Sequence, residues 1–378
     1  SNSTAIEAAQ KLNIPVLWLV ADESIAGKFS LNTEQMPENP LGNESGFNGD
    51  DDEALVLHTS GTTGRPKIVP LSLKNVLASA RNIGNTLSLT SEDKGVGIMA
   101  LFHIHGLMAS VTAPLAAGGS VYYTPGFNAR HIIDWMDEAQ PTWYTGVPTM
   151  HQGLLTQASK EKNRPIVEGF AKNIRFVRSA SAALPPSVLA ELEALFPNAV
   201  VVESYAMTEA CHQMTSNPVD RARRKPGTVG IAARPDVRIM DPLSENLLPA
   251  GEEGDIVIRG ENVTAGYHNN PEANAKDFTS NGWFRTGDTG VMDDEGYLKL
   301  VARTKEIINR GGEKIAPVEV DNAISEHPAV AQVATFSIPD QKWGEIVGAA
   351  VVLREGESIE PTELQKYVRE KLADFKVP

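Results

Sequence analysis

The sequence is poor in cysteine and in positive charge, and each shortage excludes a class of protein. Cys211 is the only cysteine among 378 residues, so no disulfide can form within the chain, and this usage fits a reducing compartment. Lysine and arginine number 34 against 48 aspartates and glutamates, which gives a formal net charge of −14. Because a general nucleic-acid or anionic-membrane binder needs a basic face, this balance argues against both.

Long hydrophobic runs are also missing. No stretch approaches the roughly 18 uninterrupted apolar residues that indicate a membrane-spanning helix, so we expect no transmembrane segment. Hydrophobic residues make up 41% of the chain and charged residues 22%, which is ordinary for a globular protein with a sizeable core. The length is enough for two or three domains. An acidic chain can still bind anionic ligands, because a local pocket of lysine and arginine suffices.

The middle of the chain alternates between apolar strands and helices. The expected strands are 96–101, 119–123, 142–145, 174–179 and 199–203. The expected helices are 104–117, 130–139, 148–158 and 186–196. This alternation predicts an α/β fold in which a parallel sheet carries helices on both faces.

The segments before this sheet are more varied. We expect a helix over 4–12 and a buried strand over 14–20. Residues 37–53 are rich in Pro, Gly, Asn and Asp, which is typical of an exposed linker. A strand at 54–58 and a helix at 73–87 follow.

The segments after the sheet form two further units. Gly and Pro become frequent from residue 226 and short β runs dominate, which predicts a β-rich subdomain over about 226–302. The last unit, 303–378, has an α+β pattern of its own. Its expected elements are a helix at 317–327, strands at 329–338 and 346–353, and a helix at 360–373.

Residues 57–67 read LHTSGTTGRPK and concentrate small hydroxyl residues and glycines ahead of a lysine. A flexible loop is one interpretation. The other is a phosphate-binding loop, in which glycine lets N–H groups converge, hydroxyl groups add donors and Lys67 supplies a compact positive charge. The spacing is not that of the P-loop, so this segment alone leaves both interpretations open.

Three later segments could complete a nucleotide site. In SYAMTE, which follows a strand-like run, Tyr205 could stack on a base, Thr208 could donate to a phosphate and Glu209 could hold Mg²⁺. The alternative is a strand cap with a solvated glutamate. Asp288 in GWFRTGDTG could accept two ribose hydroxyls or stabilise its own turn. Arg303 opens the basic stretch ARTKEIINRGGEK, and a surface salt bridge is its alternative role.

The order of these segments is more specific than any one of them. A Ser/Thr/Gly loop with lysine, then YxxTE, GWFRTGD and RxKEIINRGGEKI, together resemble the adenylate-forming superfamily of acyl-CoA synthetases, adenylation domains and luciferases. In such enzymes ATP and a carboxylate give an acyl-adenylate and pyrophosphate, and the CoA thiol then displaces AMP. The resemblance implies a large N-terminal domain, 1–302, hinged to a C-terminal lid, 303–378.

The resemblance also implies roles for the motif residues. Tyr205 matches the aromatic residue that stacks on adenine, Thr208 the hydroxyl donor to the α-phosphate, and Glu209 the magnesium ligand. The loop that wraps the β- and γ-phosphates matches Thr59, Ser60, Gly61, Thr62, Thr63, Gly64 and Lys67.

Further matches lie in the last third of the chain. Asp288 and Arg303 match the ribose-binding residues, Lys305 the hinge of the lid, and Gly311 and Gly312 the segment that faces the CoA tunnel. Members of the superfamily usually extend further at both ends and carry a late catalytic lysine in a PKTxxGKI-like segment. We therefore expect this sequence, which ends in DFKVP, to be truncated at both ends.

Polar residues near the expected acyl pocket bear on the identity of the acid. They are His103, His105, Ser179, Ser181 and His212. A fatty-acyl tunnel is lined by apolar side chains, and buried polar groups cost free energy unless a substrate satisfies them. The set therefore favours a small polar acid; the alternative is that some of these histidines are structural.

The combination of FHIHG, RSASAAL, YAMTEAxHQMTSNP and KPGTVG is similar to the oxalate–CoA ligases of plants and fungi, also described as peroxisomal coenzyme A synthetases. This narrower resemblance implies that one carboxylate of oxalate is adenylated while His105, Ser181 and His212 hold the other. It implies ATP, Mg²⁺ and coenzyme A as cofactors and co-substrates.

Two other functions stay open. The chain could be a medium-chain fatty or aryl acyl-CoA ligase or, from another class, a non-catalytic nucleotide-binding protein. We expect small-molecule partners alone, namely a carboxylic acid, ATP and CoA, with no nucleic acid and no membrane. The expected location is the cytoplasm, or the peroxisome in a eukaryote; the oligomeric state is not indicated.

Overall fold

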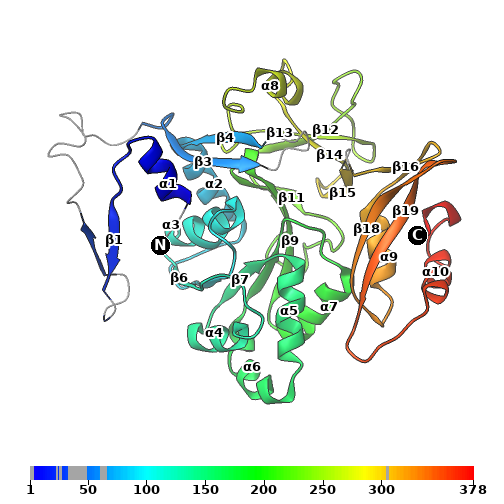
Figure 1. Cartoon of the computed structure of the whole chain (residues 1–378), viewed down its shortest axis with the longest axis horizontal. Helices are drawn as coiled ribbons and strands as arrows, with labels where there is room; N and C mark the ends of the chain where they lie inside the picture. Colours follow the sequence, from blue (N-terminus) through cyan, green and yellow to red (C-terminus); the bar gives the residue numbers. More distant parts are fainter. Residues whose placement is uncertain (1–3, 23, 25–27, 33–48, 60–65, 304–305) are drawn as a thin grey trace. The chain divides into compact units, whose positions relative to one another are not determined.

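The computed structural model describes residues 4–22, 24, 28–32, 49–59, 66–303 and 306–378 (Figure 1). They belong to two compact units, Ser1–Gly49 and Asp50–Pro378.

The first unit contains one helix and one pair of strands. Helix α1 (Thr4–Lys11) confirms the helix predicted there, and β1 (Trp18–Ala21) pairs antiparallel with β2 (Phe29–Asn32). All four residues of β1 are exposed, so the prediction of a buried strand over 14–20 was wrong. An apolar run in the sequence shows that a strand is hydrophobic, but the strand is buried only if a second layer of structure covers it. A pair of strands alone provides no such layer.

The centre of the second unit is a seven-stranded sheet in the order β11-β10-β9-β8-β7-β5-β6. Strands β5 to β9 run parallel, as predicted, while β10 (His212–Ser216) and β11 (Ile231–Ala232) extend one edge in the antiparallel sense. The parallel strands are β5 (Lys94–Gly97), β6 (Ser120–Tyr123), β7 (Trp143–Gly146), β8 (Phe176–Ser179) and β9 (Val200–Met207).

Helices cover both faces of this sheet, which confirms the predicted layering. Neighbouring strand residues point to opposite faces, so Trp143 and Phe176 pack in one core while Tyr144 and Val177 pack in the other. The first core includes side chains of α2, η1 and α3, and the second those of α4 to α7. These helices are α2 (Leu73–Thr86), the π-helical η1 (His105–Thr112), α3 (Ala113–Ala116), α4 (Ile132–Ala139), α5 (Pro148–Ala158), α6 (Arg164–Phe170) and α7 (Pro186–Leu195).

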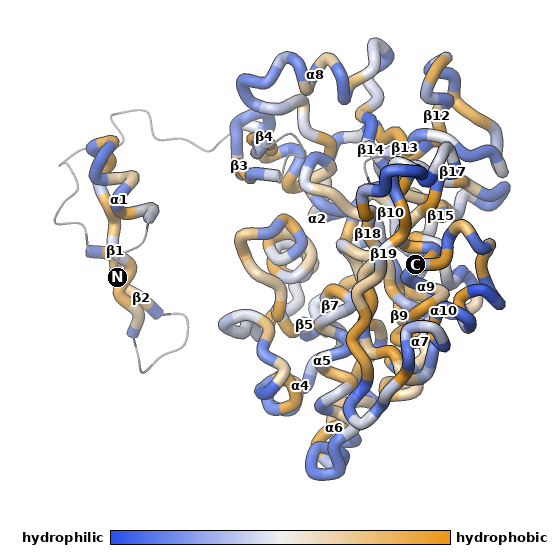
Figure 2. The backbone as a smooth tube through the Cα atoms, turned by 45° about the vertical axis from the view of Figure 1, so that its right-hand side comes forward, coloured by the Kyte–Doolittle hydropathy of each residue, from blue (hydrophilic) through white to orange (hydrophobic). Residues whose placement is uncertain are grey.

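Two antiparallel sheets follow the parallel one, as expected for a β-rich segment and an α+β segment. The first contains β12 (Asp236–Met240), β13 (Glu253–Arg259), β14 (Phe284–Met292) and β15 (Leu298–Arg303), with α8 (Pro271–Asp277) nearby. The second contains β16 (Ile308–Arg310), β17 (Glu313–Ile315), β18 (Val330–Asp340) and β19 (Gly344–Leu353), with α9 (Pro317–Ser325) and α10 (Pro361–Arg369). In this second sheet α9 packs on β18 and α10 packs on α9 (Figure 1), and much of β19 is hydrophobic (Figure 2).

Helix η1 begins at His105 and packs closely against the segment that precedes it. A Cβ atom on Gly106 would lie 2.3 Å from the carbonyl oxygen of Ala100 and 3.1 Å from that of Met99. Because backbone atoms cannot move aside as the end of a side chain can, glycine is required here. This contact fixes where His105 enters the helix.

We expect Gly106→Ala to lower the free energy of unfolding by about 2–3 kcal/mol, because overpacking forces the backbone to shift. Gly84→Ala in α2 is the matched control, since a Cβ there meets nothing within 4 Å. That change should raise stability by up to about 1 kcal/mol through its helix propensity. Urea unfolding of both variants measures the difference; equal stability of the two would contradict this account of η1.

Candidate active site

The predicted acyl-pocket residues gather at the carboxyl ends of the parallel strands. Strand β5 lies between β6 and β7, so the chain leaves β5 toward one side and later returns on the other. Open α/β sheets bind ligands outside the carboxyl ends of their strands at such a switch point. His105 lies in the segment after β5, Thr145 lies in β7, and Ser181 follows β8.

His105 joins these strand ends through hydrogen bonds. Its Nδ1 lies 3.1 Å from Ser181 Oγ and its Nε2 lies 2.7 Å from Thr145 Oγ1. The ring of His212 stacks on that of His105, with centroids 4.9 Å apart. Ser181 has a φ of 72° and His212 a φ of 99°, so both residues are held in the left-handed region. The structure thus brings three of the predicted substrate residues together.

Arg178 lies at the centre of the same cluster and was missed from the sequence. Its side chain is fully buried. Its Nη1 lies 3.3 Å from both Thr145 Oγ1 and His105 Nε2, and its Nη2 donates to Gln213 Oε1 at 3.0 Å. Arginine is rarely buried, so the usable signal was its position inside the apolar run of a central strand.

Several buried polar atoms of this cluster have no hydrogen-bond partner in the part of the chain that is described. They are Ser179 Oγ, Gln213 Nε2, Arg178 Nε and both ring nitrogens of His212. An unsatisfied buried polar group costs about 1–3 kcal/mol, so the cluster has unused capacity to bind a polar ligand. Of the predicted substrate residues, His103 and Ser181 are exposed. The ring of His103 lies beside that of Phe102, with centroids 4.4 Å apart.

Burial also sets the charge states in the cluster. Desolvation, reinforced by the positive charge of Arg178, holds the pKa of His105 and that of His212 well below their usual range. Burial lowers the pKa of Arg178 to about 9, which leaves it positively charged at neutral pH. The two histidines therefore act as neutral hydrogen-bonding groups beside one buried cation.

A second group of predicted residues meets around Tyr267. Lys67 Nζ lies 4.1 Å from the centroid of the Tyr267 ring and 2.6 Å from Asp277 Oδ2. The Tyr267 hydroxyl donates to Glu209 Oε1 at 2.9 Å. Thr208 begins the short 3₁₀ helix η4 (Thr208–Ala210) directly before Glu209. Tyr267 and Asp277 were missed, because neither belongs to a motif in the sequence.

The glutamate of this group suits a magnesium ion bound with phosphate. Burial raises the pKa of Glu209 even though the charge of Lys67 and the hydrogen bond from Tyr267 act in the opposite direction, so a divalent cation beside this carboxylate would stabilise its charged form. Mg²⁺ is commonly held by one or two carboxylates together with substrate phosphates. The described ranges contain no group of three His, Cys, Asp or Glu residues that could hold a metal ion.

The predicted ribose residues are also brought together. Asp288 of β14 and Arg303 of β15 are direct partners across the strand pair. The hydroxyl of Tyr205 donates to Asp288 Oδ2. Tyr205, predicted to stack on a base, therefore contacts the predicted ribose residue Asp288 through its hydroxyl group.

The two ends of the predicted phosphate loop lie in paired strands. Thr59 ends β3 (Glu53–Thr59) and pairs across the strands with Lys67, which begins β4 (Lys67–Ser72). The ends of the loop are therefore adjacent. The residues between, Ser60, Gly61, Thr62, Thr63 and Gly64, and the predicted hinge residue Lys305 lie outside the described residues.

Gly311 and Gly312 form the turn between β16 and β17, with φ values of 61° and 102°. The Gly311 amide donates to the Trp343 carbonyl at 2.7 Å, and a Cβ on Gly311 would lie 2.6 Å from the Trp343 ring. Both the positive φ and this contact therefore demand glycine at position 311.

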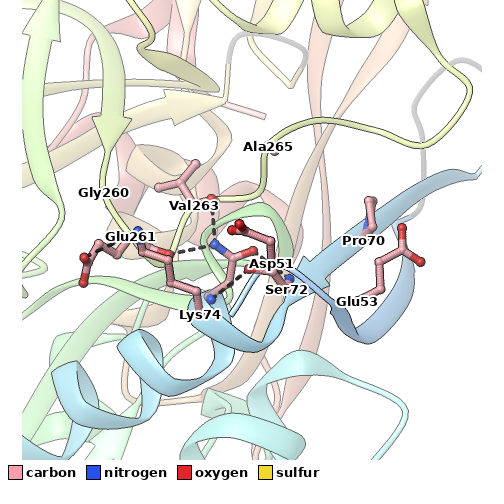
Figure 3. A pocket seen from close by; sticks show the side chains of 10 residues that line it. Asp51, Glu53, Pro70, Ser72, Lys74, Gly260, Glu261, Val263 and Ala265 are labelled. Atoms are coloured by element: carbon pink, nitrogen blue, oxygen red, sulfur yellow. Dashed lines mark hydrogen bonds and ion pairs between the residues drawn. The ribbon is translucent and has the colours of Figure 1, made fainter. Parts of the chain in front are cut away.

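A separate surface groove of about 380 Å³ lies beside the start of α2 (Figure 3). Lys74 Nζ faces Glu261 Oε1 at 3.8 Å, and Asn75 donates to the Glu261 carbonyl at 2.7 Å. Because these polar groups are paired with one another, we do not place the chemistry there. The groove is lined by Asp51, Glu53, Pro70, Ser72, Lys74, Asn75, Gly260, Glu261, Val263 and Ala265.

The described residues include no helix that is both long and apolar enough to span a bilayer.

Comparisons with known proteins agree with this arrangement. The model of the family described as AMP-binding enzyme matches residues 3–268, and that of the AMP-binding enzyme C-terminal domain matches residues 319–378. An oxalate–CoA ligase of Saccharomyces cerevisiae and another of Arabidopsis thaliana are each 45% identical over 88% of this chain. The chain spans 60% and 63% of their respective lengths.

A solved structure is similar as well. The crystal structure of ATP-bound MatB from Rhodopseudomonas palustris matches with a TM-score of 0.78 at 34% identity, over 88% of this chain and 64% of that one.

Because His105 and His212 are neutral in the folded protein, the stability of the fold should depend on pH. In an unfolded chain histidine takes up a proton near pH 6.5, whereas His105 and His212 resist protonation in the folded state. The unfolded state therefore binds more protons below about pH 6.5, so stability falls as the pH drops through that value and is unaffected by these groups above about pH 7.

Replacing one of these histidines should reduce this dependence. We expect the loss of unfolding free energy between pH 7 and pH 5 to be smaller in His212→Asn than in the parent by about 2 kcal/mol. Denaturant unfolding of both proteins at the two pH values measures it. Parallel pH profiles would show that His212 becomes protonated as readily in the folded protein as in the unfolded one.

Proposed function

This chain belongs to the AMP-binding enzyme family, and from that premise we propose that it is an ATP-dependent, AMP-forming acid–CoA ligase whose substrate is oxalate or another small polar acid. The observation that carries the proposal is the polar cluster at the strand ends, in which His105, Arg178 and His212 are buried and Ser181 is exposed. An acyl chain would meet unsatisfied polar groups there. The similarity to oxalate–CoA ligases supports the same assignment.

In the proposed reaction a carboxylate oxygen of the acid attacks the α-phosphorus of ATP. The bond from the α-phosphorus to pyrophosphate breaks, and an acyl-adenylate forms. The sulfur of CoA then attacks the acyl carbon, AMP leaves with the bonding electrons, and the thiol proton is released. Both half-reactions depend on stabilising negative charge on oxygen, which fixed donors and cations achieve best in a site shielded from water.

We assign the residues around Tyr267 to the triphosphate. Lys67 would bind phosphate oxygens together with the loop that starts at Thr59, and Thr208 would donate to the α-phosphate. Glu209 would hold Mg²⁺, which neutralises charge on the phosphate oxygens when bound. In the described structure Asp277 pairs with Lys67 at 2.6 Å, so nucleotide phosphates would compete with Asp277 for this lysine.

The nucleoside and CoA assignments follow the strand pairing. Tyr205, Asp288 and Arg303 meet where β14 and β15 pair, which supports their assignment to adenine and ribose. We assign Gly311 and Gly312 to the CoA-facing turn and Lys305 to the hinge of the lid.

At the level of the whole chain, we propose an N-terminal domain over 1–302 and a C-terminal lid over 303–378. The partners would be the acid, ATP and CoA. We place the protein in the cytoplasm, or in the peroxisome if its source is eukaryotic.

The test is pyrophosphate release by the complete native protein with ATP and Mg²⁺. Oxalate, malonate, acetate, octanoate and coumarate are each supplied with and without CoA. We expect release to be fastest with oxalate, and AMP to be freed together with an acyl-CoA when CoA is present. Fastest release with octanoate or coumarate would favour a fatty or aryl acyl-CoA ligase, and no release with any acid would favour a non-catalytic nucleotide-binding protein.

A variant then separates the acid pocket from the nucleotide site. His212→Ala should lower kcat/KM for oxalate at least about tenfold, since it removes a ring that can hydrogen-bond the acid, while ATP binding measured by calorimetry stays unchanged. Loss of ATP binding in the variant would contradict the placement of His212 in the acid pocket.

A further inference from the structure

Arg178 is a buried cation without a carboxylate partner in the part of the chain that the structure describes. Its side chain is 0% exposed. By contrast Arg175, three residues earlier, pairs with Asp93 at 2.8 Å, and Arg224 pairs with Glu193 at 2.8 Å. An uncompensated buried charge is destabilising by several kcal/mol, so a charge kept in this state points to an anion supplied from outside the fold.

The hydrogen bonds that start at Arg178 have a fixed direction. A guanidinium can only donate, so Arg178 Nη1 donates to Thr145 Oγ1 at 3.3 Å. The single hydroxyl proton of Thr145 is then available to His105 Nε2, 2.7 Å away. An accepting Nε2 places the proton of the neutral imidazole on Nδ1.

The next hydrogen bond in this series runs from His105 to Ser181. His105 Nδ1 donates to Ser181 Oγ, 3.1 Å away, so the hydroxyl proton of Ser181 has to point to some other acceptor. Ser181 is exposed, unlike the other members of this chain of hydrogen bonds. The series Arg178, Thr145, His105, Ser181 therefore ends in a donor at the accessible end of the cluster.

A second series starts at the other nitrogen of the guanidinium. Arg178 Nη2 donates to Gln213 Oε1 at 3.0 Å, which leaves the Gln213 amide nitrogen as a donor without a partner among the described residues. Beside it, both ring nitrogens of His212 have none either. The Gln213 amide and the one N–H of the neutral His212 ring are thus unused donors next to one positive charge. A carboxylate supplies acceptors alone and the opposite charge.

We propose that Arg178 is a specificity-determining residue, which balances the charge of a second carboxylate on the acid substrate and fixes the tautomer of His105 so that Ser181 donates to that carboxylate. This inference rests on the proposed function. The site then selects a small dicarboxylate over an acid of the same shape whose far end is uncharged. Arg178 acts on the substrate in two ways, through the electrostatic attraction of its charge and through the tautomer of His105. In fixing that tautomer it is a positioning residue.

Oxamate provides the matched ligand, because it replaces one carboxylate of oxalate with an uncharged amide of nearly the same shape. We expect the complete native protein to prefer oxalate over oxamate in kcat/KM by on the order of 100-fold. Arg178→Met should reduce this preference at least tenfold, mainly by raising KM for oxalate, and Arg178→Lys should restore part of it. Arg175→Met is the control and should leave the preference unchanged.

A merely structural arginine would give a different result. Folded Arg178→Met would then lose oxalate and oxamate activity in parallel, with the preference intact, and that outcome overturns the proposal. If Arg178→Met does not fold, Thr145→Val decides, since it removes only the hydroxyl that links Arg178 to His105. We expect it to reduce the preference for oxalate too, and an unchanged preference refutes the proposed link.

Two readouts do not depend on turnover. Nitrogen-15 NMR of the histidine side chains should show His105 with its proton on Nδ1 in the parent and a change in that signature in Thr145→Val. Calorimetric titration should show tighter binding of oxalate than of oxamate, and Arg178→Met should lose this difference. Failure of the proposed function would appear as absence of pyrophosphate release from every acid, whereas the inference about Arg178 fails when oxalate and oxamate bind equally to the parent protein.

Discussion

The hydrogen bonds of one fully buried arginine are the constraint on which the candidate acid site depends. Arg178 links β7 to β10 through Thr145 and Gln213, and its charge helps to keep His105 neutral. Arg178, His105 and His212 are buried and shielded from water. Electrostatic interactions are stronger in such surroundings than in solvent, so a single charge can control both the protonation of the ring and the choice of ligand.

The nucleotide side depends on contacts between segments that are far apart in the sequence. Lys67 and Glu209 are held on either side of Tyr267, and Asp288 and Arg303 meet only because β14 pairs with β15. The β-rich sheet therefore carries the two predicted ribose residues, while the candidate acid site lies at the strand ends of the parallel sheet. The assignment of the chain to the AMP-binding enzymes accounts for both halves at once.

Much of this architecture could be predicted from the sequence, because strands buried on both faces leave continuous apolar runs and amphipathic helices leave a periodic pattern. The short antiparallel strands β4, β10, β16 and β17 and helix α6 were not predicted. Their lengths give little periodicity, and strand pairing is decided by partners distant in the sequence. The exposed strand β1 was predicted to be buried for a related reason, since hydrophobic composition does not specify a covering layer.

The site residues divide in the same way. His105, Ser181 and His212 could be identified because they stand in segments with recognisable motifs. Arg178 and Tyr267 could not, since their roles follow from burial and from which strands are neighbours. An arginine inside an apolar strand is therefore a sequence feature that can be used to predict a ligand site.

The measurement that tests the central claim most directly is a crystal structure of the complete native protein with oxalate and a non-reactive ATP analogue. The account predicts that one carboxylate lies within hydrogen-bond distance of Ser181 Oγ and a ring nitrogen of His212, while the other faces the α-phosphate. Oxalate bound elsewhere, with water or a protein carboxylate beside Arg178, would contradict it.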